Sequence, residues 1–196
     1  MNILDESFEF ERKFLVGERS IVVGVDPDLI IQSYLTIREG YVVRVRLHVD
    51  ADGQFLPDVT NENLDAVWWS YVANGEWVVR RGVLTVKTPG VSGIRFESEL
   101  ELPPEVALHF CRLSDNVIIK LRYPIIWGED LWVIDIFCGQ NSPLMLAECE
   151  RDEPVDELDV PSFCGREVTG DFRYSNECLA AFPCAEIGRA SCRERV

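Results

Sequence analysis

Alternation of charged and apolar residues dominates this chain and predicts β-strands, because side chains two positions apart on a strand point to the same face. Eight segments carry the pattern, at residues 8–17, 29–37, 41–49, 77–88, 93–102, 117–126, 131–138 and 144–150. Turn signals such as Glu39-Gly40 and Pro89-Gly90 separate several of them. This succession of short strands and turns predicts an antiparallel meander closed into an eight-stranded β-barrel with few flanking helices.

Helices are predicted at two short segments. Residues 105–113 follow a Pro-Pro pair, and proline is favoured in the first turn of a helix. Residues 175–181 form the second segment, with Ser175 as the N-cap and with Leu179 and Phe182 turned inward. Both segments are short, so the fold class remains mainly β.

Residues 51–76 carry two conflicting patterns. Four apolar residues have the spacing of one helix face: Leu64, Val67, Trp68 and Tyr71. Asn74-Gly75, by contrast, lies between aromatic and β-branched runs and is a strong hairpin signal. We favour the hairpin, and we expect its tryptophans to pack on the outside of the barrel. The alternative is that the segment caps a mouth of the barrel and narrows the choice of substrate.

Length and composition favour one soluble domain. The chain has 196 residues, of which 47% are hydrophobic, enough for a single core. No apolar run is long enough to span a membrane, and the acidic N-terminus lacks the basic, then apolar pattern of a secretory signal. Seven cysteines without a C-x-x-C pair indicate reduced thiols. We therefore expect a cytoplasmic protein.

The last ten residues differ from the rest of the chain. Residues 187–196 resemble the translation of a sequencing-adaptor read-through, and they are basic where the preceding body is acidic. We expect them to be a non-native tail and the domain to cover residues 1–186.

The net charge of −15 argues against a nucleic-acid surface, which requires clusters of Lys and Arg. The charged residues nevertheless share one face of each predicted strand and carry both signs. A half-exposed sheet explains such a face on one strand, but a closed barrel with a charged lumen explains it better across seven. The acids of this face are Glu9, Glu11, Glu97, Glu99, Glu101, Asp135, Glu148 and Glu150. The bases are Lys13, Arg44, Arg46, Lys87, Lys120 and Arg122.

These eight acids and six bases give the lumen a formal net charge of −2. Such a lumen repels a polyanion unless cations are added. Two divalent ions would bring it to +2, and carboxylate oxygens suit Mg²⁺ or Mn²⁺.

Glu9, Glu11 and Lys13 form an E-x-E-x-K pattern on the first predicted strand. This pattern resembles the signature that opens proteins of the CYTH family, the triphosphate tunnel metalloenzymes. Further matching pieces follow in the order of that family, at residues 32–35, 43–46, 84–87, 95–101, 119–123, 135–137, 146–150 and 167–176. One such pattern is weak evidence, but nine ordered matches identify a resemblance over nearly all of residues 7–182.

The resemblance implies a tunnel in which basic residues hold a triphosphate and acidic residues hold Mg²⁺ or Mn²⁺. Phosphate would be bound by Lys13, Arg44, Arg46, Lys87, Lys120 and Arg122. Metal would be held by Glu9, Glu11 and Glu150, assisted by Asp135 and Glu148, with Glu97 and Glu101 as further lumen acids. We expect Glu99 to orient the attacking water, and we expect Lys13 and Arg46 to stabilise the transition state as well as bind substrate.

The resemblance implies a small-molecule triphosphate as the substrate, and we favour inorganic triphosphate. Thiamine triphosphate hydrolysis and class IV adenylate cyclase activity are alternatives, and a non-catalytic binding module is an alternative of another class. Val133 motivates the last one, because the family usually has an acid at that position. His48 continues the face of Arg44 and Arg46 and is a candidate phosphate contact near a tunnel end, whereas we expect His109 to be structural. We expect no DNA or membrane partner, and a homodimer remains open.

Overall fold

The computed structural model describes residues 5–51, 56–89, 94–151 and 157–184, with backbone only for residues 5–9, 94 and 95. The strands are β1 (Asp5–Val16), β2 (Asp28–Arg38), β3 (Tyr41–Ala51), β4 (Trp77–Lys87), β5 (Ile94–Leu102), β6 (Val117–Trp127), β7 (Asp130–Phe137), β8 (Met145–Arg151) and β9 (Cys164–Glu167). The helices are α1 (Leu64–Ala73), α2 (Pro104–Cys111) and α3 (Asn176–Ala181), with 3₁₀ turns η1 (Arg19–Val22), η3 (Gly139–Asn141) and η4 (Phe172–Tyr174).

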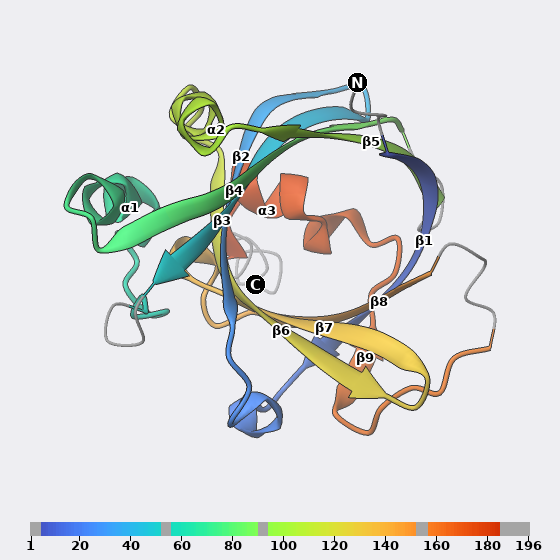
Figure 1. Ribbon diagram of the computed structural model, residues 1–196. Coiled ribbons are helices and arrows are strands. Elements are labelled where there is room, and N and C mark those ends of the chain that lie inside the picture. Colours follow the sequence, from blue (N-terminus) through green and yellow to red (C-terminus); the bar gives the residue numbers. More distant parts are fainter. Residues whose placement is uncertain (1–4, 52–55, 90–93, 152–156, 185–196) are drawn as a thin grey trace, which may run out of the picture.

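The strands form one antiparallel sheet whose ends meet. Their order is β5-β4-β3-β2-β6-β7-β8-β1-β9, and β1 also pairs with β5. Strand β1 is long enough for both neighbours, because residues 5–10 pair with β5 and residues 10–15 pair with β8. Eight strands therefore form a closed ring, visible in Figure 1, and β9 pairs with the C-terminal end of β1. The predicted barrel and its eight strands are confirmed.

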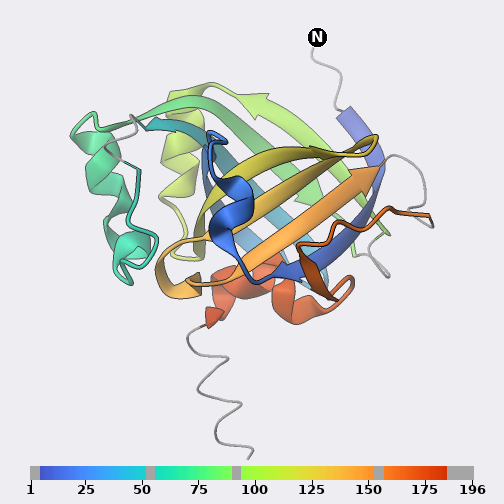
Figure 2. The ribbon, with the colours of Figure 1, turned by 90° about the horizontal axis from the view of Figure 1, so that it is seen from below.

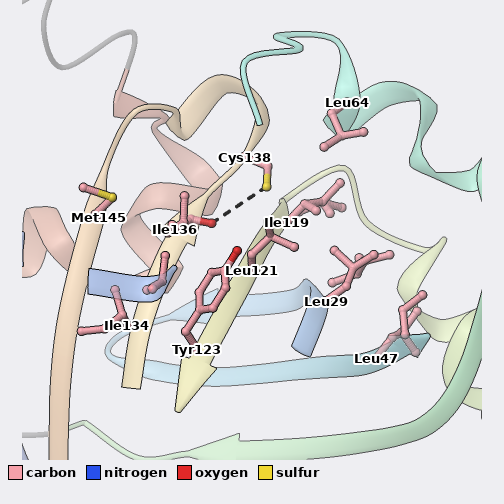
Figure 3. Close-up of a cluster of buried hydrophobic side chains, with 14 of the residues drawn as sticks. Leu29, Leu47, Leu64, Ile119, Leu121, Tyr123, Ile134, Ile136, Cys138 and Met145 are labelled. Carbon is pink, nitrogen blue, oxygen red and sulfur yellow. Dashed lines mark hydrogen bonds between the residues drawn. The ribbon is translucent and has the colours of Figure 1, made fainter. Parts of the chain in front are cut away.

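An apolar core covers the outside of the ring rather than filling it. Residues that alternate with the charged face, such as Ile31, Val45 and Ile134, are buried in this core. Figure 3 shows side chains of several strands gathered with Leu64 of α1 facing them. Helix α2 packs closely against β4 because Gly82 of β4 has no side chain. A Cβ at Gly82 would lie 2.1 Å from the Cβ of Ala107 on α2. The two helices thus shield the apolar face of β3 and β4.

A second apolar cluster closes one end of the ring. Five of its buried residues lie on the lumen face of their strands: Tyr34, Val42, Ile118, Phe137 and Leu146. They pack with Leu179 and Ala180 of α3 and with Val168. In Figure 1 α3 lies within the outline of the ring, and Figure 2 places it at one end. The lumen is therefore sealed at this end by an apolar plug, and its charged residues lie between the plug and the opposite end, the mouth.

The favoured hairpin within residues 51–76 is wrong, because residues 64–73 form helix α1. Leu64 and Trp68, one helical turn apart, are both buried in the outer core. Asn74 and Gly75 end the helix instead of forming a hairpin: the Gly75 N–H donates to Val72 O (3.1 Å) and the Glu76 N–H donates to Tyr71 O (2.9 Å). This is a Schellman motif, and it uses the positive φ of 77° at Gly75.

The tryptophans of this segment pack outside the ring, as expected. Trp68 joins the outer core, and the Arg112 guanidinium lies 3.9 Å from the centre of the Trp69 ring. Residues 52–55 of the same segment lie outside the described residues, as does the expected read-through tail at 187–196.

The predicted helices at the two other sites are confirmed, with one exception. Helix α2 has proline in its first turn, and Ser175 caps α3 by accepting a hydrogen bond from Cys178 N at 3.2 Å. Leu179 is buried as expected, but Phe182 is 60% exposed. The expectation for Phe182 is wrong because the helix ends at Ala181 and the backbone of Phe182 leaves the helical conformation. No helix among the described residues has the length and apolar character needed to cross a membrane.

Replacing Gly75 by Ala should destabilise the protein by about 1 kcal/mol, because a residue with a Cβ is strained at positive φ. No atom lies within 4 Å of the position of the added Cβ, so the effect isolates backbone strain. Gly17→Ala is the matched control, since Gly17 is equally uncrowded and has no positive φ. Urea unfolding of both variants measures the difference. Equal midpoints would show that the Schellman ending of α1 contributes nothing.

Candidate active site in the barrel lumen

One side of the lumen holds a chain of alternating charges from four adjacent strands. Asp135 of β7 accepts from Lys120 Nζ at 2.5 Å and from both Nε and one terminal nitrogen of Arg122 at 2.7 Å. The same terminal nitrogen of Arg122 also donates to Glu148 Oε2 of β8 at 3.1 Å. Lys13 Nζ of β1 then lies 3.0 Å from both Glu148 Oε1 and Glu11 Oε1. The alternating order follows from register, because Arg122 is directly opposite Asp135 and Lys13 is directly opposite Glu148.

Burial and neighbouring charges determine the protonation of the side chains in this row of alternating charges. Burial acts to raise the pKa of Asp135, but Arg122 and Lys120 hold it below its ordinary value. Burial acts to lower the pKa of Lys13, but the Glu11 and Glu148 carboxylates raise it. Lys120 differs, because burial and the charge of Arg122 lower its pKa to about 8. Asp135, and likewise Glu148 beside Lys13, therefore stays ionised near neutral pH.

The opposite side of the lumen holds a smaller network on β3, β4 and β5. Arg44 donates through Nε to Thr85 Oγ1 (3.3 Å) and lies 3.6 Å from Glu99 Oε1 and 3.9 Å from Glu97 Oε2. Thr85 in turn donates to Glu99 Oε1 at 2.9 Å. Lys87 forms an ion pair with Glu97. Burial acts to raise the pKa of Glu99, but Arg46 and the Thr85 hydroxyl lower it further than burial raises it.

Arg46 lies between these two networks and belongs to neither. Its Nε donates to Gln32 Oε1 at 3.0 Å, and within the described part of the chain it forms no ion pair. Burial, followed by the charges of Arg44 and Arg122, lowers the pKa of Arg46 to about 9. Three guanidinium groups thus face the same part of the lumen, and among the described residues Arg46 makes no ion-pair contact, although the charge of Glu99 acts to raise its pKa.

The remaining predicted residues lie toward the mouth. Glu101 is exposed and pairs with Arg81 at 3.3 Å. Glu150 is exposed on β8, directly opposite Glu11 of β1. Glu9 is opposite Arg95 in the pairing of β1 and β5, and its side chain is outside the described residues. Val133 is directly opposite Glu148 in the pairing of β7 and β8, so an apolar side chain stands beside the buried carboxylate.

Three polar residues of the site received no role from sequence reasoning: Gln32, Tyr34 and Thr85. Thr85 is two residues from Lys87, so the period-two pattern could have placed it in the lumen. Gln32 is directly opposite Arg46, and its Nε2 donates to the Tyr34 hydroxyl at 3.1 Å. Burial raises the pKa of Tyr34 to about 12, which keeps this hydroxyl protonated at neutral pH.

The acids of β1 and β8 are the best match to a divalent ion. Glu148 Oε1 is buried and lies 3.0 Å from Lys13 Nζ. Carboxylate oxygens are ligands that Mg²⁺ and Mn²⁺ prefer, so a metal ion at this oxygen would take the place of the Lys13 contact. Among the described residues, however, no three His, Cys, Asp or Glu side chains are already grouped as a metal site. Glu11 and Glu148 are held by Lys13 instead, and would have to turn toward the ion.

Fold and site together define a class of protein: a closed antiparallel barrel whose lumen is lined by both signs of charge and sealed at one end. No family model matches the sequence. An inorganic triphosphatase of Acetivibrio thermocellus is 31% identical over 182 residues, covering 89% of this chain and 94% of that protein. An inorganic triphosphatase of Nitrosomonas europaea is 42% identical over 52 residues, or 26% of this chain and 34% of that protein.

A solved structure of an inorganic triphosphatase has the same fold. Its TM-score is 0.53 at 24% identity, over 88% of this chain and 93% of that chain. The chain belongs to the CYTH family, the triphosphate tunnel metalloenzymes. The resemblance carried by the E-x-E-x-K pattern and the eight later pieces is confirmed.

Proposed function

We propose that this chain is a triphosphatase that hydrolyses a phosphoanhydride bond of inorganic triphosphate within its lumen, with the help of Mg²⁺ or Mn²⁺. The observation that carries the proposal is Arg46, a cation in a desolvated position beside Arg44 and Arg122 that makes no ion-pair contact with a carboxylate of the described residues. Clustered cations of this kind are stabilised by a polyanion that bridges them. The curated relative that covers most of the chain is an inorganic triphosphatase, which supports this choice of anion.

The bases would hold the substrate from three sides. Arg44 and Arg46 come from β3, Lys120 and Arg122 from β6, and Lys13 from β1. Guanidinium and ammonium groups bind phosphate oxygens in the ground state and stabilise the charge that develops on the leaving group. Because most of these side chains already rest on carboxylates, the lumen is organised before the substrate enters. The plug leaves the mouth as the side from which substrate would reach them.

The acids would divide into two roles. Glu11, Glu148 and Glu150 would hold the divalent ion, which when bound supplies charge neutralisation and acidifies water. Glu99 would orient the attacking water, because its carboxylate is ionised and fixed by the Thr85 hydroxyl close to Arg44. The expected contributions of Glu9 and Asp135 to metal binding remain predictions, and Glu97 and Glu101 are further acids of the lumen. In the structure Asp135 serves first as the counter-ion of Lys120 and Arg122.

The substrate is tested by supplying inorganic triphosphate, thiamine triphosphate and ATP, each with Mg²⁺ or Mn²⁺. Phosphate, pyrophosphate and cyclic nucleotide are measured as products. We expect phosphate and pyrophosphate from inorganic triphosphate at the highest kcat/KM. Arg46-dependent binding without turnover of any triphosphate would instead identify a binding module, which Val133 beside Glu148 motivates.

The role of Glu99 is tested by Glu99→Gln, which keeps the volume and removes the charge. We expect kcat for inorganic triphosphate to fall by about 10²- to 10³-fold with a smaller change in KM, as for loss of a group that handles the water. Glu129→Gln, in the exposed turn between β6 and β7, is the control and should match the parent. A kcat for Glu99→Gln within a few-fold of the parent would remove Glu99 from this role.

A further inference from the structure

A cluster of three charged or titratable residues lies toward the mouth, beyond the residues discussed so far. We call Asp28, His48 and Arg80 the rim cluster. His48 Nδ1 is 2.6 Å from Asp28 Oδ2, and Arg80 pairs with the other oxygen of Asp28. Arg80 Nε also lies 3.0 Å from Asp50 Oδ1. The cluster joins the ends of β2, β3 and β4.

His48 lies on the lumen face. It follows Arg44 and Arg46 by alternation along β3, while Leu47 and Val49 on either side are buried in the outer core. The position is one alternation step from Arg46 toward the mouth, a spacing of about 6.6 Å on a strand. The side chain of His48 is 16% exposed, so it lies inside the mouth rather than on the outer surface.

A bulge in β4 brings Arg80 to the same side. The pairing of β3 with β4 passes from His48–Arg81 to Val49–Val79, so Arg80 is an extra residue in its strand. Bulges redirect side chains in this way. Arg80 can therefore reach across β3 to Asp28. The charged groups around His48 are Asp28 from β2, Arg46 and Asp50 from its own strand, Arg80 and Arg81 from β4, and Arg122 of β6 opposite Asp28.

The contacts of His48 occupy one ring nitrogen and leave the other available for a phosphate ligand. Burial acts to raise the pKa of Asp28, but hydrogen bonding by His48 and the charge of Arg80 hold it below its ordinary value, so Asp28 is an anion. One ring nitrogen is engaged with that anion, and the other, Nε2, has no hydrogen-bond partner among the described residues. An imidazolium held by a carboxylate on Nδ1 presents Nε2–H as a charged donor.

We propose that His48, positioned by Asp28, is a further substrate-binding residue that donates from Nε2 to the phosphoryl group nearest the mouth. The proposal rests on the proposed function, because it needs a linear triphosphate bound at Arg44 and Arg46. The apolar plug closes the other end of the lumen, so the outer end of such a chain lies on the His48 side. The Asp28–Arg80 pair serves to hold the imidazole, and neither side chain is required to touch substrate.

The test compares two substitutions that imitate different edges of the ring. His48→Asn places an amide near the position of Nδ1, so it can keep the Asp28 contact but cannot reach substrate. His48→Gln places its amide near the position of Nε2, so it can reach substrate but loses the Asp28 contact. KM and kcat for inorganic triphosphate are measured with Mg²⁺ at one fixed pH. His109→Asn on α2 is the control, because His109 is exposed and its Nδ1 contacts only Glu105 O at 2.7 Å.

We expect His48→Asn to raise KM about tenfold to a hundredfold, the usual effect of losing a charged hydrogen bond, with a smaller change in kcat. His48→Gln should recover part of that loss. His109→Asn should match the parent in both KM and kcat.

The opposite order of the variants would overturn the proposal. If His48→Asn matches the parent and His48→Gln alone is impaired or melts lower, the imidazole only joins the strand ends. A parent that hydrolyses inorganic triphosphate with the same KM as both His48 variants would likewise contradict the proposal and leave the proposed function standing. A parent that neither binds nor hydrolyses inorganic triphosphate would overturn both.

Discussion

Asp135→Asn should lower the free energy of unfolding by about 3–5 kcal/mol, the usual cost of removing one partner from a buried ionic network. The substitution keeps the side-chain volume and leaves Lys120 and Arg122 desolvated without their shared carboxylate. A loss of this size is a large fraction of the about 5–15 kcal/mol that stabilises a typical domain. Equilibrium unfolding in urea measures it as a lower midpoint at an unchanged slope.

The effect should depend on pH with a defined sign. The pKa of Asp135 is lowered in the folded protein, so its contribution is present above the pKa of the unfolded chain and is lost as pH falls through the folded value. The parent and Asp135→Asn should therefore converge in stability in acid. A constant gap between them down to acidic pH would show that the loss comes from geometry rather than charge.

Glu167→Gln is the matched control for Asp135→Asn. Arg12 binds both oxygens of Glu167 at 3.0 and 2.8 Å, which resembles the two contacts between Arg122 and Asp135. The Arg12–Glu167 pair is partly exposed, with side chains 25% and 41% accessible, and such pairs contribute at most about 1 kcal/mol. Equal destabilisation by the two substitutions would contradict the weight given to burial at Asp135.

The strands were predictable because the alternation of this chain is unusually complete. In an ordinary sheet the polar face tolerates many residue types, but here both faces are constrained, one by the outer core and one by the charged lumen. Strand β9 was missed because Cys164–Glu167 is short and has no such alternation, and only its pairing with Phe14 and Val16 of β1 makes it a strand. The hairpin prediction at residues 74 and 75 was wrong for another reason, since Asn-Gly fits a tight turn and the end of a helix equally well.

The lumen residues were predictable as a set, but their partners were not. Alternation assigns Arg46 and Asp135 to the same face as the other charged residues of the predicted lumen. Which acid meets which base depends on register and on the order of strands around the ring, which a single sequence does not specify. Thus Asp135, which is expected to assist metal binding, also pairs with two cations that the sequence did not identify as its partners, while Arg46 has no ion pair among the described residues. The plug was missed because Ile118, Phe137 and Leu146 interrupt the charged face only near the ends of their strands, and because β2, which carries Tyr34, has no charged residue between Asp28 and Arg38.

Arg46→Met should change activity and stability in opposite directions. For activity, we expect kcat/KM for inorganic triphosphate to fall by about 10²- to 10³-fold, because a charged donor to the transferred or leaving phosphoryl group is lost. For stability, methionine keeps an unbranched apolar stem of similar length and removes a cation that the fold disfavours. A gain of about 1 kcal/mol is expected, which corresponds to about 2–4 °C in Tm for a domain of this size.

The sign of the stability change follows from the pKa of Arg46. Burial and the charges of Arg44 and Arg122 lower it to about 9, so the folded protein disfavours the charged form relative to the unfolded chain. The free-energy cost of keeping Arg46 charged in the folded protein is fully present below pH 9 and decreases only as pH rises above that value. At pH 7 the parent therefore carries all of it, and Arg46→Met carries none.

Thermal unfolding with and without inorganic triphosphate and Mg²⁺ tests both halves of this prediction. Without ligand, Arg46→Met should melt higher than the parent. With ligand, the parent should gain stability by binding while Arg46→Met gains much less. The difference in Tm between the two proteins should therefore narrow or change sign. Arg38→Met is the control, because the Arg38 side chain is 83% exposed on β2 and should affect neither property. If Arg46→Met instead melts lower and keeps its turnover, Arg46 is a structural residue of the barrel and the anion site lies elsewhere.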